Sequence, residues 1–587
     1  MKKAEFSVHL ENIAGAFFLL LTLLMPVKYG TIGCMPEAGS FYPDSIIDYL
    51  YVSWPASTFG VFSGISLLLC ILFCRPQIRY SNLTASMLLF TAALPLAALW
   101  GKLIAPSSFY GEAMFTHIAG AAAYLGAAYI LTAANPAWKN RILSFLGIGT
   151  LLLTISAFHQ YFFGFKEMHE FARMQEEQGI VLSDAIRLKL IDGRVYGAMS
   201  SANLLSGFML CAAPLLVSVA AMASRRFEPQ KQSFILFTSV AACLGFGTLL
   251  MTKTRGAFLA LGAAVVLWIF SNNKIKKLYK VVLLLAIAAV FVGGTLYIKY
   301  HGRGFGSMAE RVSYLRTAAV MISEKPLTGF GWGEFFYRHM QLKDTNSNES
   351  AHDPHNIAAS FAVHTGVFGG LLVLAAFLLP LWNLWKKRNS SDMLTNCCLW
   401  GGVAGFLHAL QDINLQSPAV ICVLMLILLE NQDNAQEEKN VSNLLRYSCL
   451  LYMFVLGTVS LVGNWNYTRG DAAMSMLEEC CRPSVKEKLY LATPHNVEKS
   501  LNAVNVLRPK YPFANSLAAA FFSAAGNSSK AEKLYLTSLA LDSRRPSVLM
   551  SLADIYEKKG NMSDAEKLRD KARKLFPSNP EYKNKNE

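Results

Sequence analysis

Residues 348–383, NESAHDPHNIAASFAVHTGVFGGLLVLAAFLLPLWN, pass within a few positions from a polar loop into an apolar run. Because about 20 apolar residues make a helix that can cross a bilayer, this stretch predicts a membrane-spanning helix that begins near Ile357. His352, Asp353 and His355 then lie at a membrane surface, where the span starts. A titratable cluster in that position suggests chemistry on a substrate that is itself partly in lipid.

The composition extends this prediction to the whole chain. Of its 587 residues, 53% are hydrophobic and 16% are charged, a balance that fits poorly with a water-soluble fold. We expect an all-α, polytopic membrane protein with about 12 core spans and one extra span. The predicted spans are 12–27, 57–74, 84–104, 112–133, 142–163, 196–223, 232–251, 256–271, 280–298, 356–383, 395–410, 416–430 and 447–464.

The net charge of +15 comes largely from short loops, because Lys and Arg gather in every second connection. Cytoplasmic loops retain these residues, so we expect a cytoplasmic N-terminus and, after an odd number of spans, a C-terminal domain on the outer side. The charge is a topology signal, and no nucleic-acid partner is expected. The basic groups are Lys2 and Lys3, Arg75 and Arg79, Lys139 and Arg141, Arg225, Arg226 and Lys231, Lys274 to Lys280, and Lys386 to Arg388; the outward loops are 28–56, 164–195, 299–354 and 411–415.

The chain divides into four parts. Residues 1–431 form the membrane core, whose largest outward loop is 299–354. A polar cytoplasmic linker, 432–446, leads to the final span, 447–464. Residues 465–587 are predicted to be a soluble helical domain.

This C-terminal domain contains a repeat of about 34 residues that resembles tetratricopeptide repeats. Such units stack small residues between paired helices and leave a concave face for a peptide or protein partner. A purely structural helical cap is the alternative. The small, aromatic, turn-glycine and proline positions are Ala553, Tyr556, Gly560, Ala565, Ala572 and Pro577, then one period earlier Ala519, Phe522, Gly526 and Ala531, and one further Pro509.

Two arginines are placed at predicted outer ends of spans. Arg194 lies in GRVYG, where its planar guanidinium could hold a phosphate or could equally reach towards lipid headgroups. Arg255 follows Lys253 in MTKTRG, a short outward turn. Two cations on the non-cytoplasmic side go against the usual distribution, and a bound anion or a headgroup would compensate them.

The large outward loop offers two more cations, Arg311 and Arg316, on a predicted helix. They are five positions apart, so they do not share a helix face as residues four apart do. The following PLTGFGWGEF segment, 326–335, contains glycines that permit a tight turn close to a ligand, although turns need glycine for steric reasons as well.

The HDPHN segment, 352–356, is the candidate catalytic centre. A neutral imidazole can take a proton from a hydroxyl near pH 7, and a nearby carboxylate can orient it. We favour His355 as a general base over a metal site formed by His352, Asp353 and His355, because Pro354 makes that bite awkward. His408 and Asp412, at the outer end of another span, could face the same cavity or could simply be polar residues at a helix end.

In these motifs the chain resembles the bacterial O-antigen ligase and polymerase superfamily, over about residues 190–430. The resemblance is carried by GRVYGAMSSANLLSG, the TRGA turn, PLTGFGWGEF, HDPHN with the glycines of HTGVFGG, and HALQD, in this order and on one side of the membrane. It implies a metal-independent, inverting glycosyltransferase of the GT-C type in the bacterial inner membrane. Such enzymes transfer a glycan from undecaprenyl diphosphate to an acceptor hydroxyl on the periplasmic face.

The resemblance also implies roles for residues, and no cofactor. The acceptor is a glycan, lipid A-core or a protein, and membrane lipids surround the site. By this resemblance Arg194 and Arg255 clamp the diphosphate, His355 deprotonates the acceptor, Asn356 fixes that histidine or the substrate, and Arg316 and Arg311 are cations near the donor; His352, Asp353, His408 and Asp412 complete the expected substrate-binding set.

The extra span and repeat tail depart from the usual ligase pattern. We rank O-antigen ligase first, then glycan polymerase, then protein O-oligosaccharyltransferase, whose protein acceptor a peptide-binding tail would suit. A transporter for a polysaccharide or lipid precursor is the alternative from another class, since many spans with embedded ionisable groups suit transport too. A scaffold built around the tail is a further alternative, in which Arg194, Arg255 and His355 would be dispensable.

Overall fold

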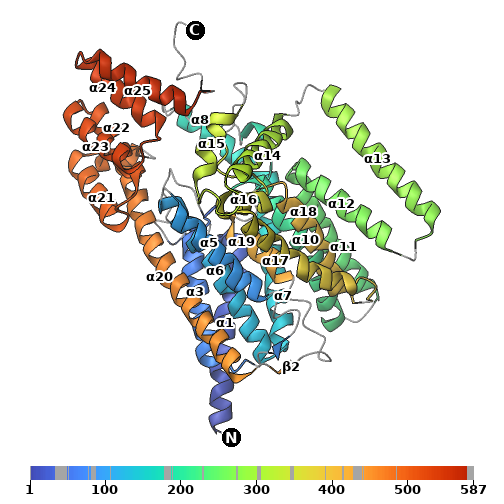
Figure 1. Cartoon of the computed structure of the whole chain (residues 1–587). Coiled ribbons are helices and arrows are strands. Elements are labelled where there is room, and N and C mark those ends of the chain that lie inside the picture. Colours follow the sequence, from blue (N-terminus) through green and yellow to red (C-terminus); the bar gives the residue numbers. More distant parts are fainter. Residues whose placement is uncertain are drawn as a thin grey trace.

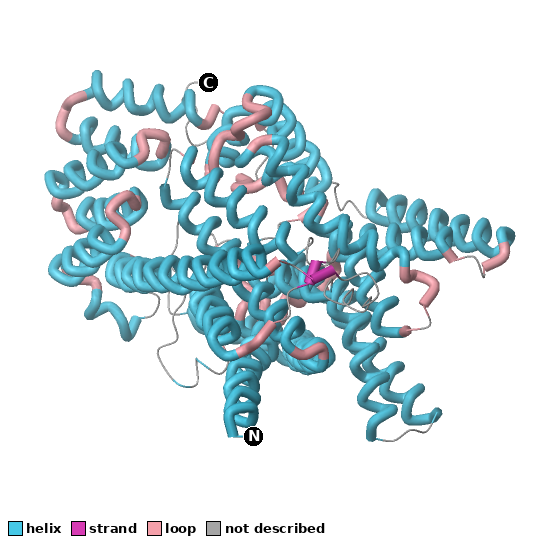
Figure 2. The backbone as a smooth tube through the Cα atoms, turned by 60° about the horizontal axis from the view of Figure 1, so that its bottom comes forward, coloured by secondary structure: helices cyan, strands magenta, loops and turns pink. Residues whose placement is uncertain are grey.

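The structure is a computed structural model, and its described elements of secondary structure are helices apart from one pair of two-residue strands (Figures 1 and 2). The predicted all-α class is therefore confirmed. The structure describes residues 2–33, 52–76, 79–80, 87–105, 108–177, 190–227, 231–272, 275–300, 306–343, 350–390, 392–412, 416–427, 439–440, 442–483 and 486–577, with the single positions 46, 49, 187 and 579.

The N-terminal half is a helical bundle centred on α6, the most deeply buried of the membrane-length helices. Alanine and glycine dominate α6, and such small residues let helix backbones approach closely. At Gly120 an added Cβ would lie 2.8 Å from the Gly60 Cα of α3. The elements are α1 (Lys2–Lys28), α3 (Ala56–Phe73), the π-helix η1 (Leu89–Ala93), α5 (Leu94–Ile104), α6 (Ser108–Ala134), α7 (Ala137–His159), the π-helix η2 (Gln160–Gly164) and α8 (Phe165–Glu177).

The central part continues the bundle, with α10 packed against α7, α11 and α18. Helix α13 lies away from the bundle in Figure 1 and contacts only its neighbour α12 to any extent. The elements are α10 (Ala202–Phe227), α11 (Lys231–Met251), α12 (Arg255–Ser271), α13 (Lys277–Tyr300), α14 (Gly306–Glu324), α15 (Glu334–Leu342), α16 (Ile357–Thr365), α17 (Val367–Lys386), α18 (Met393–Ala409) and α19 (Pro418–Leu426).

The predicted span 356–383 is not one helix, and this part of the prediction is corrected. It is divided into α16 and α17 at Gly366, which has a φ of +85° and so interrupts the helical backbone. An added Cβ at Gly366 would lie 2.2 Å from the Leu327 carbonyl oxygen, so the outer loop packs directly onto this break. Hydropathy alone cannot reveal such a break, because the segments on both sides of Gly366 are apolar and helical.

Fewer helices than predicted have full spanning length. Within the described residues, eight helices are long and apolar enough to cross a membrane, and two apolar helices, Leu89–Ile104 and Arg255–Ser271, are shorter. A polytopic membrane protein is thus confirmed. The eight are Val8–Lys28, Ala56–Phe73, Phe109–Ala134, Ala137–Glu177, Ala202–Arg226, Lys231–Met251, Val367–Lys386 and Asn443–Cys481.

The last of these, α20 (Asn443–Cys481), continues without interruption past residue 464, where the final span is predicted to end. Its apolar part packs on α3 and α6. There the Ser460 hydroxyl donates to the Gly60 carbonyl (2.8 Å) and Asn464 Nδ2 donates to the Thr116 carbonyl (3.0 Å). A single rigid helix therefore connects the bundle to the C-terminal domain.

The C-terminal domain is a series of helix pairs with a clear period. Helices α22 and α24 begin at Pro512 and Pro546, which are 34 residues apart, and α23 and α25 follow at the same interval. Gly526 and Gly560, with φ of +80° and +79°, make the turns within the two pairs. The elements are the 3₁₀-helix η5 (Lys486–Leu491), α21 (Pro494–Leu507), α22 (Pro512–Ala524), α23 (Ser528–Leu541), α24 (Pro546–Lys558) and α25 (Met562–Leu575).

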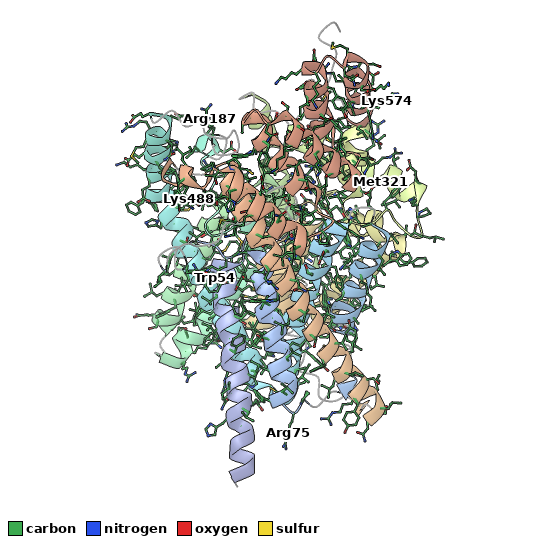
Figure 3. All side chains as sticks on the ribbon, turned by 90° about the vertical axis from the view of Figure 1, so that its left-hand side faces the viewer. Trp54, Arg75, Arg187, Met321, Lys488 and Lys574 are labelled. Atoms are coloured by element: carbon green, nitrogen blue, oxygen red, sulfur yellow. The ribbon has the colours of Figure 1, made fainter. Side chains whose placement is uncertain are left out.

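The two ends of the molecule carry different features. Figure 3 places Arg75 at one end, and Met321 of α14 and Lys574 of α25 at the other. At the Arg75 end, β1 (Arg79–Tyr80) pairs antiparallel with β2 (Lys439–Asn440). Residues 301–305, 344–349, 413–415 and 432–438, which belong to the predicted loops and linker, lie outside the described residues.

Candidate functional site

The candidate residues are brought together at the end of the bundle that carries α14 and α15. They come from the loop before α10, the turn between α11 and α12, the helix α14, the start of α16 and the end of α18. Elements far apart in the sequence thus contribute to one region.

Arg194 is fixed by three hydrogen bonds. Its Nε donates to the Thr252 carbonyl (3.0 Å), and its Nη2 donates to Asn203 Oδ1 (2.7 Å) and Thr254 Oγ1 (2.9 Å). Its Nη1 has no hydrogen-bond partner among the described residues. The guanidinium is therefore held through Nε and Nη2, and the N–H groups of Nη1 are left for a ligand.

Charged side chains of both signs surround Arg194. Burial lowers the pKa of Arg194, the carboxylates of Asp192 and Asp412 raise it, and the nearby charges of Arg311 and Arg255 lower it further. An arginine stays protonated even so. Three guanidinium groups thus lie within electrostatic reach of one another, an arrangement that an anion would stabilise.

Asp412 connects two of these groups. Its side chain is only 2% exposed, and Oδ2 accepts hydrogen bonds from Asn203 Nδ2 (2.8 Å) and Arg311 Nη2 (3.1 Å). Since Asn203 also binds Arg194, a continuous chain of hydrogen bonds joins Arg194 to α14. The buried Asp412 carboxylate therefore holds Arg311 directly, and Arg194 through Asn203.

His355 adopts a conformation that is uncommon for a residue other than glycine, with a φ of +56°. Its Nδ1 lies 2.9 Å from the Asp353 carbonyl oxygen. Because a carbonyl only accepts, the neutral ring carries its proton on Nδ1, and the lone pair is on Nε2. Nε2 has no hydrogen-bond partner in the described part of the chain, so it can accept a proton from a substrate.

The Asp353 carboxylate does not contact the imidazole. It accepts from the His355 backbone N–H through Oδ1 (2.9 Å) and from the Ser360 hydroxyl through Oδ2. The expectation that a carboxylate would orient the ring is therefore corrected, because the backbone carbonyl of the same residue does so. The carboxylate instead stabilises the turn that gives His355 its positive φ.

Asn356 caps α16. Its Oδ1 accepts from the backbone N–H groups of Ala358 (3.0 Å) and Ala359 (2.9 Å), which have no partners inside the helix. Its Nδ2 donates to the Leu410 carbonyl (2.8 Å), two residues before Asp412. Asn356 thus ties the His355 turn to the end of α18.

Tyr314 supports His355 from α14, and sequence reasoning missed it. Its ring is buried, stacks on the His355 ring with centroids 5.0 Å apart, and meets the His339 ring edge-on at the same distance. It lies one turn beyond Arg311 on the same helix. The polar partners of Arg194 were also missed, although Asn203, Thr252 and Thr254 stand inside the motifs that contain the two arginines.

The remaining candidates lie in different surroundings. Arg255 is exposed at the first position of α12 and forms no hydrogen bond or ion pair with the described residues. Arg316 is exposed on α14 and likewise has no such partner in the described part. His408 is fully buried, and its Nε2 lies 4.0 Å from the position of a Cβ added at Gly256. It therefore packs beneath the start of α12.

His352 faces away from His355. Its Nδ1 lies 3.2 Å from the Tyr110 hydroxyl, and its ring stacks on Phe336 with centroids 4.3 Å apart. Burial lowers the pKa of His352 to about 4, so the ring is neutral at pH 7. The side chains of His352, Asp353 and His355 have separate partners and do not converge, which disfavours the alternative metal site.

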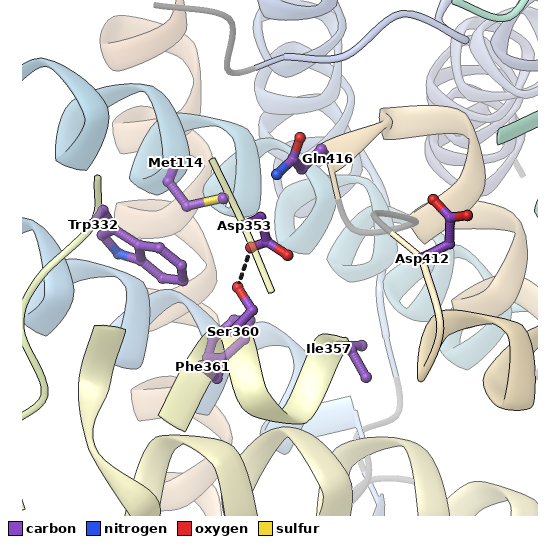
Figure 4. A pocket seen from close by; sticks show the side chains of 8 residues that line it. All are labelled: Met114, Trp332, Asp353, Ile357, Ser360, Phe361, Asp412 and Gln416. Carbon is purple, nitrogen blue, oxygen red and sulfur yellow. Dashed lines mark hydrogen bonds between the residues drawn. The ribbon is translucent and has the colours of Figure 1, made fainter. Parts of the chain in front are cut away.

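Figure 4 shows a cavity between Asp353 and Asp412, with Asp412 on the side away from Trp332. Its volume is about 10 Å³, which is at most enough for one water molecule. A sugar ring does not fit, so a glycan would have to bind outside this cavity. The lining residues are Met114, Trp332, Asp353, Ile357, Ser360, Phe361, Asp412 and Gln416.

The glycines of the 326–335 segment have a structural explanation. Gly331 has a φ of +85°, and an added Cβ would lie 2.5 Å from the Ala105 Cα. Its N–H donates to the His364 carbonyl (3.0 Å), and the buried Trp332 next to it donates from Nε1 to the Ala98 carbonyl (3.0 Å). The segment packs the outer loop onto α5 and α16, and α15 begins directly after it.

Comparison with known proteins agrees with the resemblance seen in the sequence. Residues 240–374 match a family model described as O-antigen ligase, a range that includes Arg255, His355 and Asn356. The chain is also similar to an O-antigen ligase of Pseudomonas aeruginosa, with 31% identity over 156 residues. That match covers 26% of this chain and 36% of the relative, little more than a third of its length. Both matches support the O-antigen ligase superfamily.

Proposed function

We propose that this protein is a membrane glycosyltransferase of the O-antigen ligase type. It would transfer a glycan from undecaprenyl diphosphate to an acceptor hydroxyl on the periplasmic face of the bacterial inner membrane. The observation that carries the proposal is the state of His355, whose Nδ1 is bound to a backbone carbonyl while Nε2 is open. This is the arrangement that a general base requires.

A group of arginines supports a diphosphate donor, because Arg194 lies within electrostatic reach of Arg255 and Arg311. Arg194 keeps the N–H groups of Nη1 available, and Arg255 is exposed and has no hydrogen-bond or ion-pair partner among the described residues. Arginine binds phosphate oxygens through charge-assisted hydrogen bonds, and Arg255 has its whole guanidinium available for them. The side chains of Arg194 and Arg255 would then stabilise the negative charge that develops on the leaving diphosphate.

In the proposed reaction, His355 acts as the base and the arginines bind the leaving group. Nε2 of His355 takes the proton of the acceptor hydroxyl while the acceptor oxygen attacks the anomeric carbon of the donor. The bond between that carbon and the phosphate oxygen breaks, and undecaprenyl diphosphate leaves with the electron pair. Attack on the face opposite to the leaving group inverts the anomeric configuration. The imidazolium then returns its proton to the solvent or to the product diphosphate.

Transfer by purified protein tests this proposal. The full chain in detergent would be incubated with an undecaprenyl diphosphate-linked oligosaccharide and an acceptor, with His355→Ala and Arg255→Ala alongside. We expect His355→Ala to lower kcat by roughly 10²- to 10⁴-fold, the usual contribution of a general base. Retention of wild-type transfer by His355→Ala would refute the role of His355, and the absence of transfer with every acceptor would refute the enzyme proposal.

A panel of acceptors decides among the members of the class. Lipid A-core as the productive acceptor would identify a ligase, a second lipid-linked glycan a polymerase, and a peptide or protein with Ser or Thr a protein O-oligosaccharyltransferase.

Arg316→Ala is a suitable comparison, because Arg316 is exposed and has no hydrogen-bond or ion-pair partner within the described residues. A fall in kcat/KM for that variant would place the donor against α14.

A further inference from the structure

Helix α15 lies between the C-terminal helices and the His355 turn. On the side of the C-terminal domain, Glu334 at its start is held by Arg544, whose Nη1 donates to both carboxylate oxygens (2.8 and 2.7 Å). The two side chains are 14% and 26% exposed, so this ion pair is partly buried. Arg544 comes from the connection between α23 and α24, more than 200 residues away.

A second contact strengthens the same interface. The Tyr337 hydroxyl donates to Asp542 Oδ2 (2.6 Å), and the Arg544 guanidinium lies over the Tyr337 ring, 4.1 Å from its centroid. Burial alone would lower the pKa of Arg544, but the hydrogen bond with Glu334 and the charges of Glu334 and Asp542 raise it above its ordinary value. Arg544 therefore remains charged and bound to α15 at every physiological pH.

An aromatic stack carries the contact towards the HDPHN segment. Phe336 of α15 meets Phe576, at the end of α25, edge-on with centroids 5.5 Å apart. On its other side it stacks nearly parallel on His352, with centroids 4.3 Å apart and 8° between the planes. A residue of the C-terminal domain and a residue of the candidate catalytic segment thus share one aromatic neighbour.

Another residue of α15, His339, is connected to His355 through Tyr314. His339 is fully buried, its Nδ1 lies 3.1 Å from the Thr317 hydroxyl of α14, and its ring meets Tyr314 edge-on. Tyr314 in turn stacks on His355. Displacement of α15 would therefore disturb the support of His355 through Tyr314 and that of His352 through Phe336, because well-packed side chains have few alternative arrangements.

We propose that Glu334 and Arg544 are positioning residues, through which the C-terminal helical domain holds α15 and thereby aligns His355 for proton transfer. This inference rests on the proposed function. It gives the C-terminal domain a role within its own chain, in addition to the partner binding that its repeat suggests. Neither residue touches the donor or the acceptor in this account.

Hydrogen exchange in the full-length protein tests the structural part. The amides of His355, Ala358 and Ala359 are protected by side-chain hydrogen bonds of the turn, and their exchange would be compared between wild type, Glu334→Gln and Arg544→Ala in detergent. We expect exchange at these amides to become at least about tenfold faster in both variants, since local opening is governed by local stability. Unchanged exchange in both would overturn the inference.

Two comparisons separate this effect from simple unfolding. Glu334→Gln leaves the C-terminal domain itself intact, and exchange in α22–α25 reports whether Arg544→Ala has unfolded that domain. Arg569→Ala is a matched control, because Arg569 also binds two carboxylates, Asp554 and Glu557, but these lie within the repeat. Accelerated exchange of the His355 turn in Arg569→Ala as well would count against a specific role of the Glu334–Arg544 pair.

Kinetics tests the functional part. A misplacement of about 1 Å can lower a rate by about 10²-fold, so we expect Glu334→Gln and Arg544→Ala to lower kcat roughly 10- to 100-fold, with KM changed by less than about threefold. Arg544→Lys, which keeps the charge, should restore part of kcat. Wild-type kcat in both variants would overturn the positioning role, even if His355→Ala is inactive. If no acceptor is glycosylated at all, the proposed function fails. The hydrogen-exchange experiment then still decides whether the Glu334–Arg544 pair stabilises the His355 turn.

Discussion

The residues of the candidate site are held in unusual backbone conformations. Among the described residues, Lys253 and His355 are the non-glycine residues with positive φ, +51° and +56°. One lies beside Arg255 and the other is the candidate base. Strained conformations persist where the surrounding contacts enforce them, and they are frequent at functional sites. Here the enforcing contacts are the two hydrogen bonds from His355 to Asp353.

At the same scale, His352 should make stability depend on pH. Burial lowers the pKa of its imidazole from 6.5 to about 4 in the folded protein. Between these values the unfolded chain binds a proton that the folded protein does not, so stability is complete above about pH 6.5 and falls as the pH drops towards 4. The loss attributable to this group is up to about 3 kcal/mol.

Thermal unfolding of the solubilised protein between pH 4 and pH 8 measures this effect. His352→Phe keeps an aromatic ring against Phe336 and removes the titration, so its melting temperature should fall less on acidification than that of wild type. His339, whose pKa burial also lowers to about 4, titrates in the same window in both proteins. Parallel curves for wild type and His352→Phe would contradict the assignment.

At the scale of single elements, helix α16 depends on its N-terminal cap, Asn356. The N-terminus of α16 has a single side chain, Asn356, that satisfies two of its free N–H groups and also binds the end of α18. The next helix begins after Gly366, so α16 is only nine residues long. A helix this short depends on its cap and its packing more than on its intrinsic propensity.

Asn356→Ala should therefore affect both stability and transfer. Loss of an N-cap costs about 0.5–2 kcal/mol, and loss of the bond to Leu410 frees the His355 turn, so we expect a lower melting temperature and a kcat reduced about tenfold or more. Asn527→Ala removes the same kind of cap, from α23. That control should lose stability alone, and a similar fall of kcat in it would show that general destabilisation explains the Asn356 result.

For the molecule as a whole, the arrangement along the bundle leads to a topology prediction. The N-terminus and Arg75 lie at one end, whereas the C-terminal helices, α14 and α15 lie at the other (Figures 1 and 3). The Lys and Arg residues of the short loops predict that the Arg75 end lies in the cytoplasm. The candidate site and the repeat domain would then both lie on the periplasmic side.

Reporter fusions test this orientation. Alkaline phosphatase fused after residue 579 should be active, because this enzyme folds only in the oxidising periplasm, and a green fluorescent protein at the same place, exported unfolded by the general secretory route, should be dark. Fusions after residue 76 should give the reverse pattern. Fluorescence from the C-terminal fusion would place the site in the cytoplasm and exclude a periplasmic transfer reaction.

The sequence by itself determined the class of the fold and the types of residue that matter. Apolar runs near 20 residues long must be helical in a bilayer, since every backbone polar group needs a partner inside its own segment. The 34-residue spacing likewise predicted the helix pairs around Gly526 and Gly560. Arg194, Arg255 and His355 stood out because cations and titratable groups are costly where spans begin and end.

The tertiary structure alone decided how these residues are connected. The break at Gly366 depends on the approach of the Leu327 carbonyl, and the free Nε2 of His355 depends on a carbonyl two residues earlier. Tyr314 and Arg544 carry no local signal, because their partners lie 41 and 210 residues away along the chain. The contacts of Gly366, Tyr314 and Arg544 arise from packing between elements that are distant in the sequence, for which periodicity and composition contain no information.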